Sequence, residues 1–164
     1  MKKWDQQRGR VVMIEDKPNS GRWCVQMPME RGQNHGGDAI KWFMPGADAV
    51  YARFYVKFSP DYQYNHHFVW LGANQRTNKW SAFGKAGLKP NGTYYSAGME
   101  PWFVVGEFTG IRWRNDRDLK VNFFWLEHYG YDEGDPTKQY WKDSQSVWFD
   151  DVVVARRHIG PIQR

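Results

Sequence analysis

The sequence predicts an all-β fold, an antiparallel β-sandwich, and three observations support this prediction. Short runs of β-branched and aromatic residues recur along the chain, separated by clusters of Gly, Pro, Asn and Asp. Apolar and polar residues alternate with a period of two in the clearest run, residues 50–58. The helical period is weak throughout. With 164 residues and no linker-like stretch, the chain is expected to form one domain over residues 1–164.

About eight strands are expected from these runs. In chain order they are residues 10–14, 23–27, 39–43, 50–58, 66–71, 103–108, 119–129 and 147–155. A Ser-Pro-Asp stop follows the strand at 50–58, and the run at 66–71 is expected to form a hairpin with it. The strand at 119–129 has aromatic residues on both faces, which predicts burial on both sides. The stretches at 72–101 and 132–142 are expected to be loops.

The composition points to a ligand with flat or anionic surfaces. Ten Trp, ten Phe and nine Tyr are more aromatic residues than a small core needs, so some are expected to face a ligand or partner. A net charge of +5 favours anions such as acidic polysaccharides or nucleic acids. No nucleic-acid-binding motif is present, which argues against nucleic acid.

The cysteine count and the apolar runs exclude several classes of protein. Cys24 is the only cysteine, so neither an intrachain disulfide nor a multi-cysteine metal site is possible. No run approaches the ~18 apolar residues of a membrane span, and no membrane association is expected. The start of the chain, MKKWDQQRGR, lacks the apolar segment of an intact secretory signal.

Four segments resemble a known group of proteins. They read DAIKWFMPGADAVYARFYVKFSPDY, HHFVWLG, GEFTGIRWRNDRDLKVNFFWLEHYG and VWFDDVVVARRHIGPI, and they cover well over half of the chain. They resemble secreted bacterial proteins with a concanavalin A-like jelly roll, close to the polysaccharide lyases that cleave heparin, alginate and glucuronan. The last segment is the most specific. The resemblance implies a jelly roll, an acidic polysaccharide as ligand, and an extracellular or periplasmic location.

The middle of the chain departs from this pattern. Such proteins carry further strands between a segment like GMEPW and one like GEFTGIRW, whereas here residues 98–102 run almost directly into 106–113. The sandwich is therefore expected to be incomplete, to be a natural miniature, or to take its missing strands from a neighbouring chain. Because an uncovered sheet edge pairs readily with another chain, a homo-oligomer is a further expectation.

Acid–base residues on neighbouring strands are candidates for catalysis. A lyase needs a group that neutralises the uronate carboxylate, a base and an acid, and Arg, Asn, His and Tyr suit these roles. His66 and His67 are adjacent, so they point to opposite faces of a strand and cannot easily chelate one metal. The resemblance implies that the polar face of the strand at 50–58 lies in the substrate groove. The candidate catalytic residues are Arg53, Tyr55, His66, His67, His128 and Tyr129.

Four further residues are candidates for substrate binding. Lys57 extends the polar face of the strand at 50–58, and Asn122 lies on the strand at 119–129. Trp80 and Trp102 lie beside loop residues and are expected to stack on sugar rings, whereas Trp125 lies in an apolar strand and fits the core. An ordinary solvated strand face is the alternative interpretation of Lys57 and its neighbours.

The pair Asp150-Asp151 is a candidate for a structural calcium ion. In related jelly rolls, an acidic residue near the last strand binds calcium together with an early carboxylate, for which Glu15, Asp16 and Asp38 are the candidates. An exposed bulge or an ion-paired turn is the alternative interpretation of the pair.

The sequence leaves two functions open. One is an enzyme that cleaves an acidic polysaccharide by β-elimination. The other is a non-catalytic module that binds carbohydrate or assembles with itself, and the shortened middle favours it.

Overall fold

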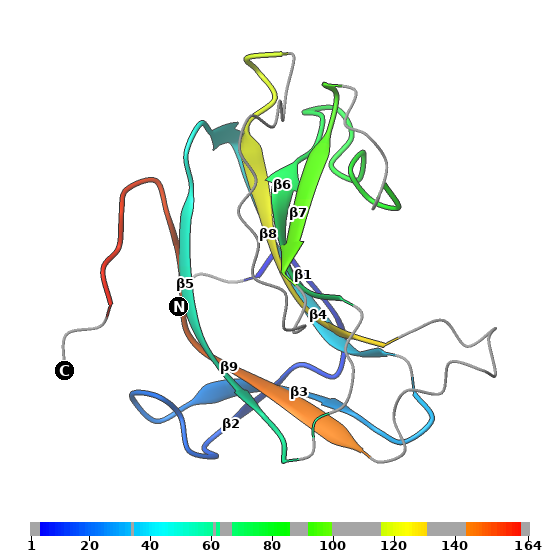
Figure 1. Ribbon diagram of the computed structural model, residues 1–164, viewed down its shortest axis with the longest axis vertical. Coiled ribbons are helices and arrows are strands. Elements are labelled where there is room, and N and C mark those ends of the chain that lie inside the picture. Colours follow the sequence, from blue (N-terminus) through cyan, green and yellow to red (C-terminus); the bar gives the residue numbers. More distant parts are fainter. Residues whose placement is uncertain are drawn as a thin grey trace.

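The fold is built from strands alone. The computed structural model describes residues 4–33, 35–60, 62, 67–85, 92–99, 116–130 and 144–161, and this part of the chain contains nine strands and no helix (Figure 1). The strands are β1 (Gln6–Gly9), β2 (Val12–Ile14), β3 (Cys24–Met29), β4 (His35–Ala47), β5 (Tyr51–Phe58), β6 (His67–Ala73), β7 (Tyr95–Met99), β8 (Val121–Tyr129) and β9 (Gln145–Ala155). Among these residues, no segment forms a helix long and apolar enough to cross a membrane.

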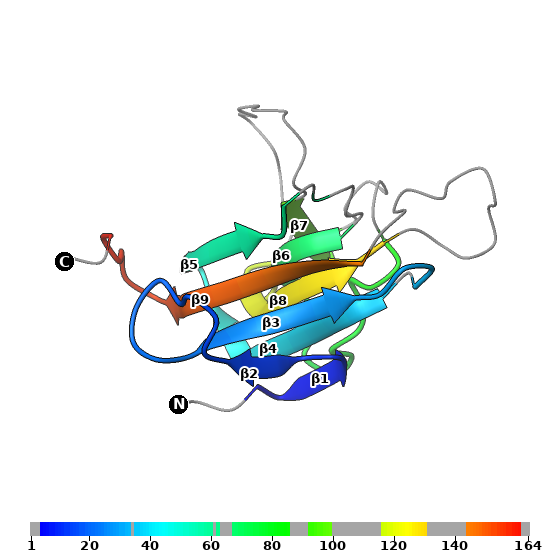
Figure 2. The ribbon, with the colours of Figure 1, turned by 90° about the horizontal axis from the view of Figure 1, so that it is seen from below.

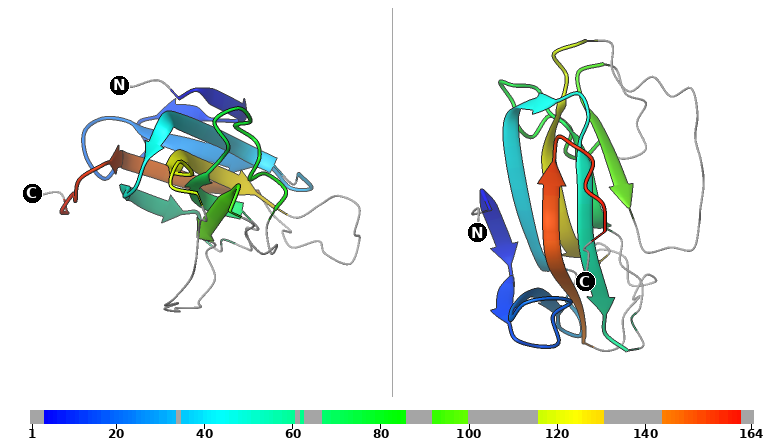
Figure 3. Two further views of the ribbon diagram at one scale, coloured as in Figure 1. Left: turned by 90° about the horizontal axis from the view of Figure 1, so that it is seen from above. Right: turned by 90° about the vertical axis from the view of Figure 1, so that its left-hand side faces the viewer.

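The strands form two antiparallel sheets that pack face to face (Figure 2). The five-stranded sheet has the order β1-β4-β8-β6-β7, and the four-stranded sheet has the order β2-β3-β9-β5. The right panel of Figure 3 looks onto the four-stranded sheet, with β9 in front of β8. The predicted all-β class is confirmed, and the arrangement is consistent with a jelly-roll-like sandwich.

The main core lies between the sheets and centres on β8. All residues of β8 except Tyr129 are buried, which confirms the predicted burial on both sides. Phe124 and Leu126 point toward the other sheet, where Met27, Val147 and Phe149 meet them. Alternate residues of β8 point the opposite way and form part of the floor of a cavity on the outer face.

Most of the expected strands overlap observed ones, but three expectations need correction. β1 was not expected, and the stretch expected as a loop at 72–101 contains β7. The expected hairpin is wrong, because β5 ends in the four-stranded sheet and β6 begins in the five-stranded sheet. The expected strand at 103–108 and the expected loop at 132–142 lie outside the described residues.

The centre of β7 consists of small residues, Ser96, Ala97 and Gly98, which let it approach β6 closely. Its sequence, Tyr-Ser-Ala-Gly-Met, has weak strand propensity, yet it pairs with β6 from Val69↔Met99 to Ala73↔Tyr95. A Cβ at Gly98 would lie 3.1 Å from the ring of Trp70, so glycine lets the backbone approach this indole. Within the described residues, β1, β7, β2 and β5 are the outer strands, where the expected oligomer would pair.

The lone cysteine lies at the beginning of β3. Cys24 is 3% exposed, and its Sγ lies 3.6 Å from the carbonyl oxygen of Asp16. Burial raises the pKa of its thiol.

Candidate functional site

A cavity of about 490 Å³ lies on the outer face of the five-stranded sheet. The period-two alternation of the strands builds its floor: Ile40 and Trp42 come from β4, Phe123 and Trp125 from β8, and Trp70 from β6. The turn at 79–84 lines one side and contributes Trp80 and Phe83. The cavity therefore has a rigid floor and one side built from a turn.

One end of the cavity is aromatic. Trp80 makes edge contacts with Trp42 and Trp125, with ring centroids 5.1 and 6.2 Å apart. Phe83 stacks on Trp125 at 5.8 Å, with 17° between the ring planes, although 57% of Phe83 is exposed. The guanidinium of Arg8 lies 5.6 Å from the ring centroid of Trp125 and 5.9 Å from that of Trp80. Flat apolar surfaces are thus available beside a fixed positive charge.

The other end of the cavity carries titratable groups. His67 stacks on Tyr129, with ring centroids 5.4 Å apart and 20° between the planes, and its edge meets Trp70 at 4.8 Å. His67 and Tyr129 are register partners on β6 and β8, which explains their contact. Glu127 precedes Tyr129 by two residues and shares its face, and His35 also lines the cavity. The arrangement offers proton donors and acceptors next to the aromatic surface.

A buried pair of asparagines holds the turn that carries Trp80. Asn122 Oδ1 accepts a hydrogen bond from the backbone N–H of Asn74 at 2.9 Å, and Asn122 Nδ2 donates to the Asn74 carbonyl at 2.7 Å. Asn74 Oδ1 in turn accepts from the N–H of Ala82 at 2.7 Å. Asn122 is 1% exposed, so its expected role as a ligand contact is replaced by a structural one.

The sequence-predicted residues divide between two faces of the sandwich. His67, Tyr129 and Trp80 line the cavity, as does Trp125 beneath it, whereas His66 and Trp102 lie outside the described residues. Residues of β9 alternate between the core, with Val147 and Phe149, and the outer face, with Trp148.

The expected convergence of Arg53, Tyr55 and Lys57 with the histidines is wrong. Lys57 is the register partner of Trp148, with its Nζ 4.3 Å from that ring centroid, and it donates to Asp16. Tyr55 lines a small hollow beside Lys57, and Arg53 donates a hydrogen bond to the carbonyl of Gly160. These side chains belong to the four-stranded sheet, whose outer face points away from the cavity.

His128 lies in the core rather than in the cavity. Its Nδ1 lies 2.7 Å from the carbonyl oxygen of Met27, and its ring stacks near Tyr62 with centroids 5.7 Å apart. Burial lowers the pKa of His128 to about 4, so the imidazole is neutral at neutral pH. Because neighbouring residues of β8 alternate in direction, His128 faces the interior while Glu127 and Tyr129 face the cavity. Its expected catalytic role is therefore corrected to a packing role.

Asp150 and Asp151 hold the loop that precedes β3. Asp150 Oδ2 accepts from the N–H groups of Asn19 and Ser20 at 2.6 and 3.1 Å, and Asp150 Oδ1 accepts from the N–H of Asp151 at 2.8 Å. Asp151 accepts from Asn19 Nδ2 at 2.8 Å and from Ser20 Oγ at 2.7 Å. The pair therefore closes a loop that lies about 130 residues earlier in the chain.

This donor set does not fit the calcium site expected from the sequence. All four carboxylate oxygens of the pair accept hydrogen bonds from protein donors. Of the expected partner carboxylates, Glu15 bonds Arg22, Asp16 bonds Lys57, and Asp38 belongs to the other sheet. Calcium requires several converging oxygen ligands, and the described carboxylates are engaged separately.

Arg8, Asp38 and Glu127 are the site residues that sequence reasoning missed. Asp38 appeared there only as a candidate calcium ligand. Arg8 Nε donates to Asp38 Oδ2 at 2.9 Å across the register pair Arg8↔Asp38. The segment His-Gly-Gly-Asp at 35–38 was an available signal, because paired glycines inside a strand indicate a bulge or a close backbone approach.

Comparisons of the chain with protein-family models, curated proteins and solved structures gave no match. The chemistry of the cavity is therefore the basis for a functional interpretation.

Proposed function

We propose that the protein binds an acidic polysaccharide in the cavity over the five-stranded sheet and cleaves it by β-elimination. One observation carries the proposal: a single cavity joins an aromatic end, beside Arg8, to a polar end that contains His67 and Tyr129. Aromatic rings offer large contact areas with few torsions to freeze, which suits sugar rings. The volume of about 490 Å³ lies within the range of about 300–1,000 Å³ that small-molecule sites occupy.

The cavity lining contains the three kinds of group that β-elimination requires. Arg8, whose side chain is 45% exposed, is a cation that can meet the carboxylate of a sugar stacked on Trp125. Neutralising that carboxylate makes the adjacent C–H more acidic. His67 and Tyr129 are then the base and the acid. The base takes the C–H proton, the electron pair forms a C=C bond, and the glycosidic C–O bond breaks as the leaving oxygen gains a proton.

The positive net charge supports an anionic substrate. A charge of +5 raises the local concentration of a polyanion and speeds its encounter with the protein. Polysaccharides of this kind lie outside the cell, so the extracellular or periplasmic location expected from the sequence belongs to the same proposal.

Incubation with alginate, glucuronan, heparin and pectin tests the reaction. An increase in ultraviolet absorbance from unsaturated uronate ends is expected for one or more of them. His67→Ala and Tyr129→Phe are each expected to reduce the rate at least about 100-fold, the usual contribution of a general acid or base. Glycan binding without a new product would leave the non-catalytic module as the function. The absence of both glycan binding and product would overturn the proposal.

A matched pair of tryptophan variants tests the binding surface. Trp80→Ala removes a ring from the cavity, whereas Trp23→Ala removes one that is 44% exposed and packs over Arg22. Affinity electrophoresis is expected to show weaker glycan binding for Trp80→Ala and unchanged binding for Trp23→Ala. An equal loss of glycan affinity in the two variants would show that the glycan does not bind in the cavity.

A further inference from the structure

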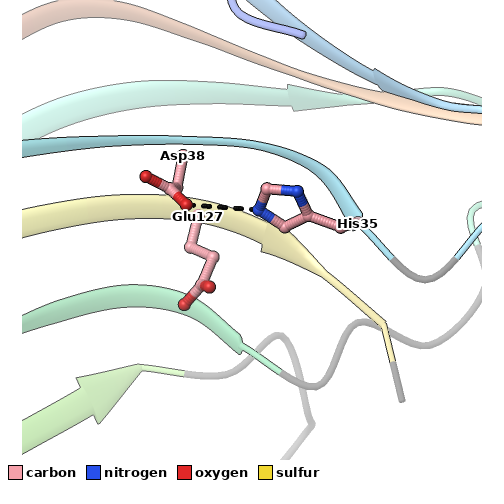
Figure 4. A group of neighbouring side chains, drawn as sticks. All are labelled: His35, Asp38 and Glu127. Atoms are coloured by element: carbon pink, nitrogen blue, oxygen red, sulfur yellow. Dashed lines mark hydrogen bonds and ion pairs between the residues drawn. The ribbon is translucent and has the colours of Figure 1, made fainter. Parts of the chain in front are cut away.

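Three side chains at the polar end of the cavity converge in a way that neither sugar stacking nor acid–base chemistry requires. One ligand atom each from His35, Asp38 and Glu127 lies within 4.8 Å of the other two. Figure 4 shows His35 and Asp38 on β4 and Glu127 on the neighbouring strand β8. Asp38 and Glu127 are register partners, so they lie side by side on the same face.

A bulge in β4 brings His35 to that face. In a regular strand, residues three apart point to opposite faces, but the register between β4 and β8 shifts between His35 and Gly37. Gly36 and Gly37 permit the bulge. A Cβ at Gly36 would lie 2.7 Å from His128 Nδ1, and one at Gly37 would lie 2.5 Å from the Arg10 carbonyl oxygen. The backbone is therefore shaped so that His35 Nε2 lies 3.2 Å from Asp38 Oδ2.

The burial of the two carboxylates makes a bound cation favourable. Asp38 is 0% exposed and Glu127 is 6% exposed. Two neighbouring carboxylates in such surroundings repel each other, and Arg8 pairs with Asp38. Asp38 Oδ1 is buried and has no hydrogen-bond partner, which is costly for a charged group. A cation bound at Asp38 would offset the charge of this carboxylate.

We propose that His35, Asp38 and Glu127 bind a divalent transition-metal ion at the polar end of the cavity. One imidazole nitrogen and two carboxylates suit Zn²⁺ or Mn²⁺ better than Ca²⁺, which prefers an all-oxygen cage. On binding, the ion takes the place of the hydrogen bond between His35 Nε2 and Asp38 Oδ2. Three protein ligands leave positions open for other groups. Because His35 and Glu127 line the cavity, an open position faces the ligand.

The open position gives the ion a role in recognition. It would coordinate a carboxylate of the polysaccharide and strengthen the charge neutralisation that Arg8 begins. This role rests on the proposed function, whereas binding of the ion itself does not.

Metal binding is measured first without any glycan. Protein freed of metal with a chelator is titrated with Zn²⁺ and with Mn²⁺ by calorimetry, and Co²⁺ is added as a visible-absorption probe of a His-carboxylate site. One ion per chain is expected. Glu127→Gln and His35→Gln are each expected to weaken binding at least tenfold. Two exposed residues provide matched controls, Glu15→Gln and His158→Gln, and these are expected to bind like the parent protein.

Circular dichroism and thermal unfolding establish that each variant is folded before it is titrated. Glu127→Gln keeps the shape of the side chain, so it is the decisive variant if His35→Gln fails to fold. The proposal is overturned if the parent protein binds neither ion, or if Glu127→Gln binds as tightly as Glu15→Gln. It is also overturned if Glu127→Gln stabilises the chelator-treated protein while the parent binds no ion, because the two carboxylates then share a proton instead.

Glycan binding with and without chelator separates this inference from the function. If the ion binds at the three residues but the protein has no glycan affinity, the proposed function is refuted and the metal site stands. Glycan binding that is unchanged by chelator, in a protein that binds no ion, would refute the metal site and leave the function standing.

Discussion

Glycine at single positions lets strands approach under the cavity, and Gly72 on β6 is the tightest case. A Cβ there would lie 2.2 Å from the carbonyl oxygen of Tyr95 and 2.9 Å from the ring of Phe123. We expect Gly72→Ala to lower the free energy of unfolding by about 1–3 kcal/mol, because the backbone of β7 cannot move away without breaking its ladder. Denaturant unfolding measures this change.

Gly160 provides the control for Gly72. A Cβ at Gly160 would meet no atom within 4 Å. Gly160→Ala is expected to change stability by less than about 0.5 kcal/mol. Similar values for the two variants would show that the approach of β6 to β7 is not sterically limited.

Asp150 is expected to be the most important acceptor for the loop before β3. Asp150→Ala leaves the N–H groups of Asn19 and Ser20 without their acceptor, and we expect a loss of about 1–3 kcal/mol in unfolding free energy. Asp48→Ala is the control, because Asp48 is 61% exposed and pairs with Lys120 on the surface.

A second variant at the same residue, Asp150→Asn, tests calcium. Hydrogen bonds to all four oxygens of the pair predict that millimolar Ca²⁺ leaves the unfolding temperature unchanged. A rise in that temperature with Ca²⁺ that disappears in Asp150→Asn would instead support the calcium site expected from the sequence.

Two rings of the aromatic end, Trp80 and Phe83, are positioned by a turn rather than by a strand. The turn at 74–84 carries Trp80 and Phe83, and Asn122 on β8 holds its beginning. We expect Asn122→Ala to lower unfolding free energy by about 1–3 kcal/mol, since it leaves the buried N–H and C=O of Asn74 unpaired. Glycan affinity is expected to fall as well, although Asn122 does not line the cavity.

Gln26 separates these two effects. Its Nε2 donates to Ser146 Oγ in the four-stranded sheet, at 3.0 Å. Gln26→Ala is expected to reduce stability without changing glycan affinity. If Asn122→Ala changed stability alone, the turn would keep its shape without the asparagine, and the site would depend on the strands only.

The strands were predictable where their own residues alternate or are apolar on both sides. Ala52 and Phe54 of β5 pack on the core as the alternation indicates, and β8 is buried on both faces. β7 was not predictable, because Ser96, Ala97 and Gly98 carry no strand signal of their own. Sheet membership was not predictable either, since alternation fixes the face of a strand but not its neighbour.

The site was predictable only where residue type sufficed. Trp80, His67 and Tyr129 were found as aromatic or acid–base side chains beside strands and loops. Arg8 and Glu127 were missed, because register rather than sequence proximity brings both to Asp38. A pattern within one strand cannot reveal a group assembled from three strands.

The sandwich as a unit separates two outer faces, and this separation predicts which variants affect function. His67→Ala, in the cavity, is expected to abolish product formation, whereas Tyr55→Phe and Lys57→Ala on the opposite face are expected to retain parental rates. Rates of unsaturated-product formation, or glycan affinity if no product forms, measure the difference.

Loss of activity in Tyr55→Phe or Lys57→Ala, with His67→Ala unaffected, would contradict this assignment. It would move the functional site to the four-stranded sheet. Thermal unfolding of all three variants provides the control, because each should remain folded at the assay temperature.

The alkylation rate of the buried Cys24 thiol measures how often this part of the molecule opens. Since the chain has one thiol, 3% exposed and with a raised pKa, an alkylating reagent can react only while this corner of the sandwich is open. The rate of alkylation therefore reports an opening frequency, free of signals from any second thiol. Comparing that rate with global unfolding distinguishes release of the loop before β3 from melting of both sheets. If Asp150→Ala is alkylated faster than its loss of global stability explains, the excess rate measures local opening of the loop before β3.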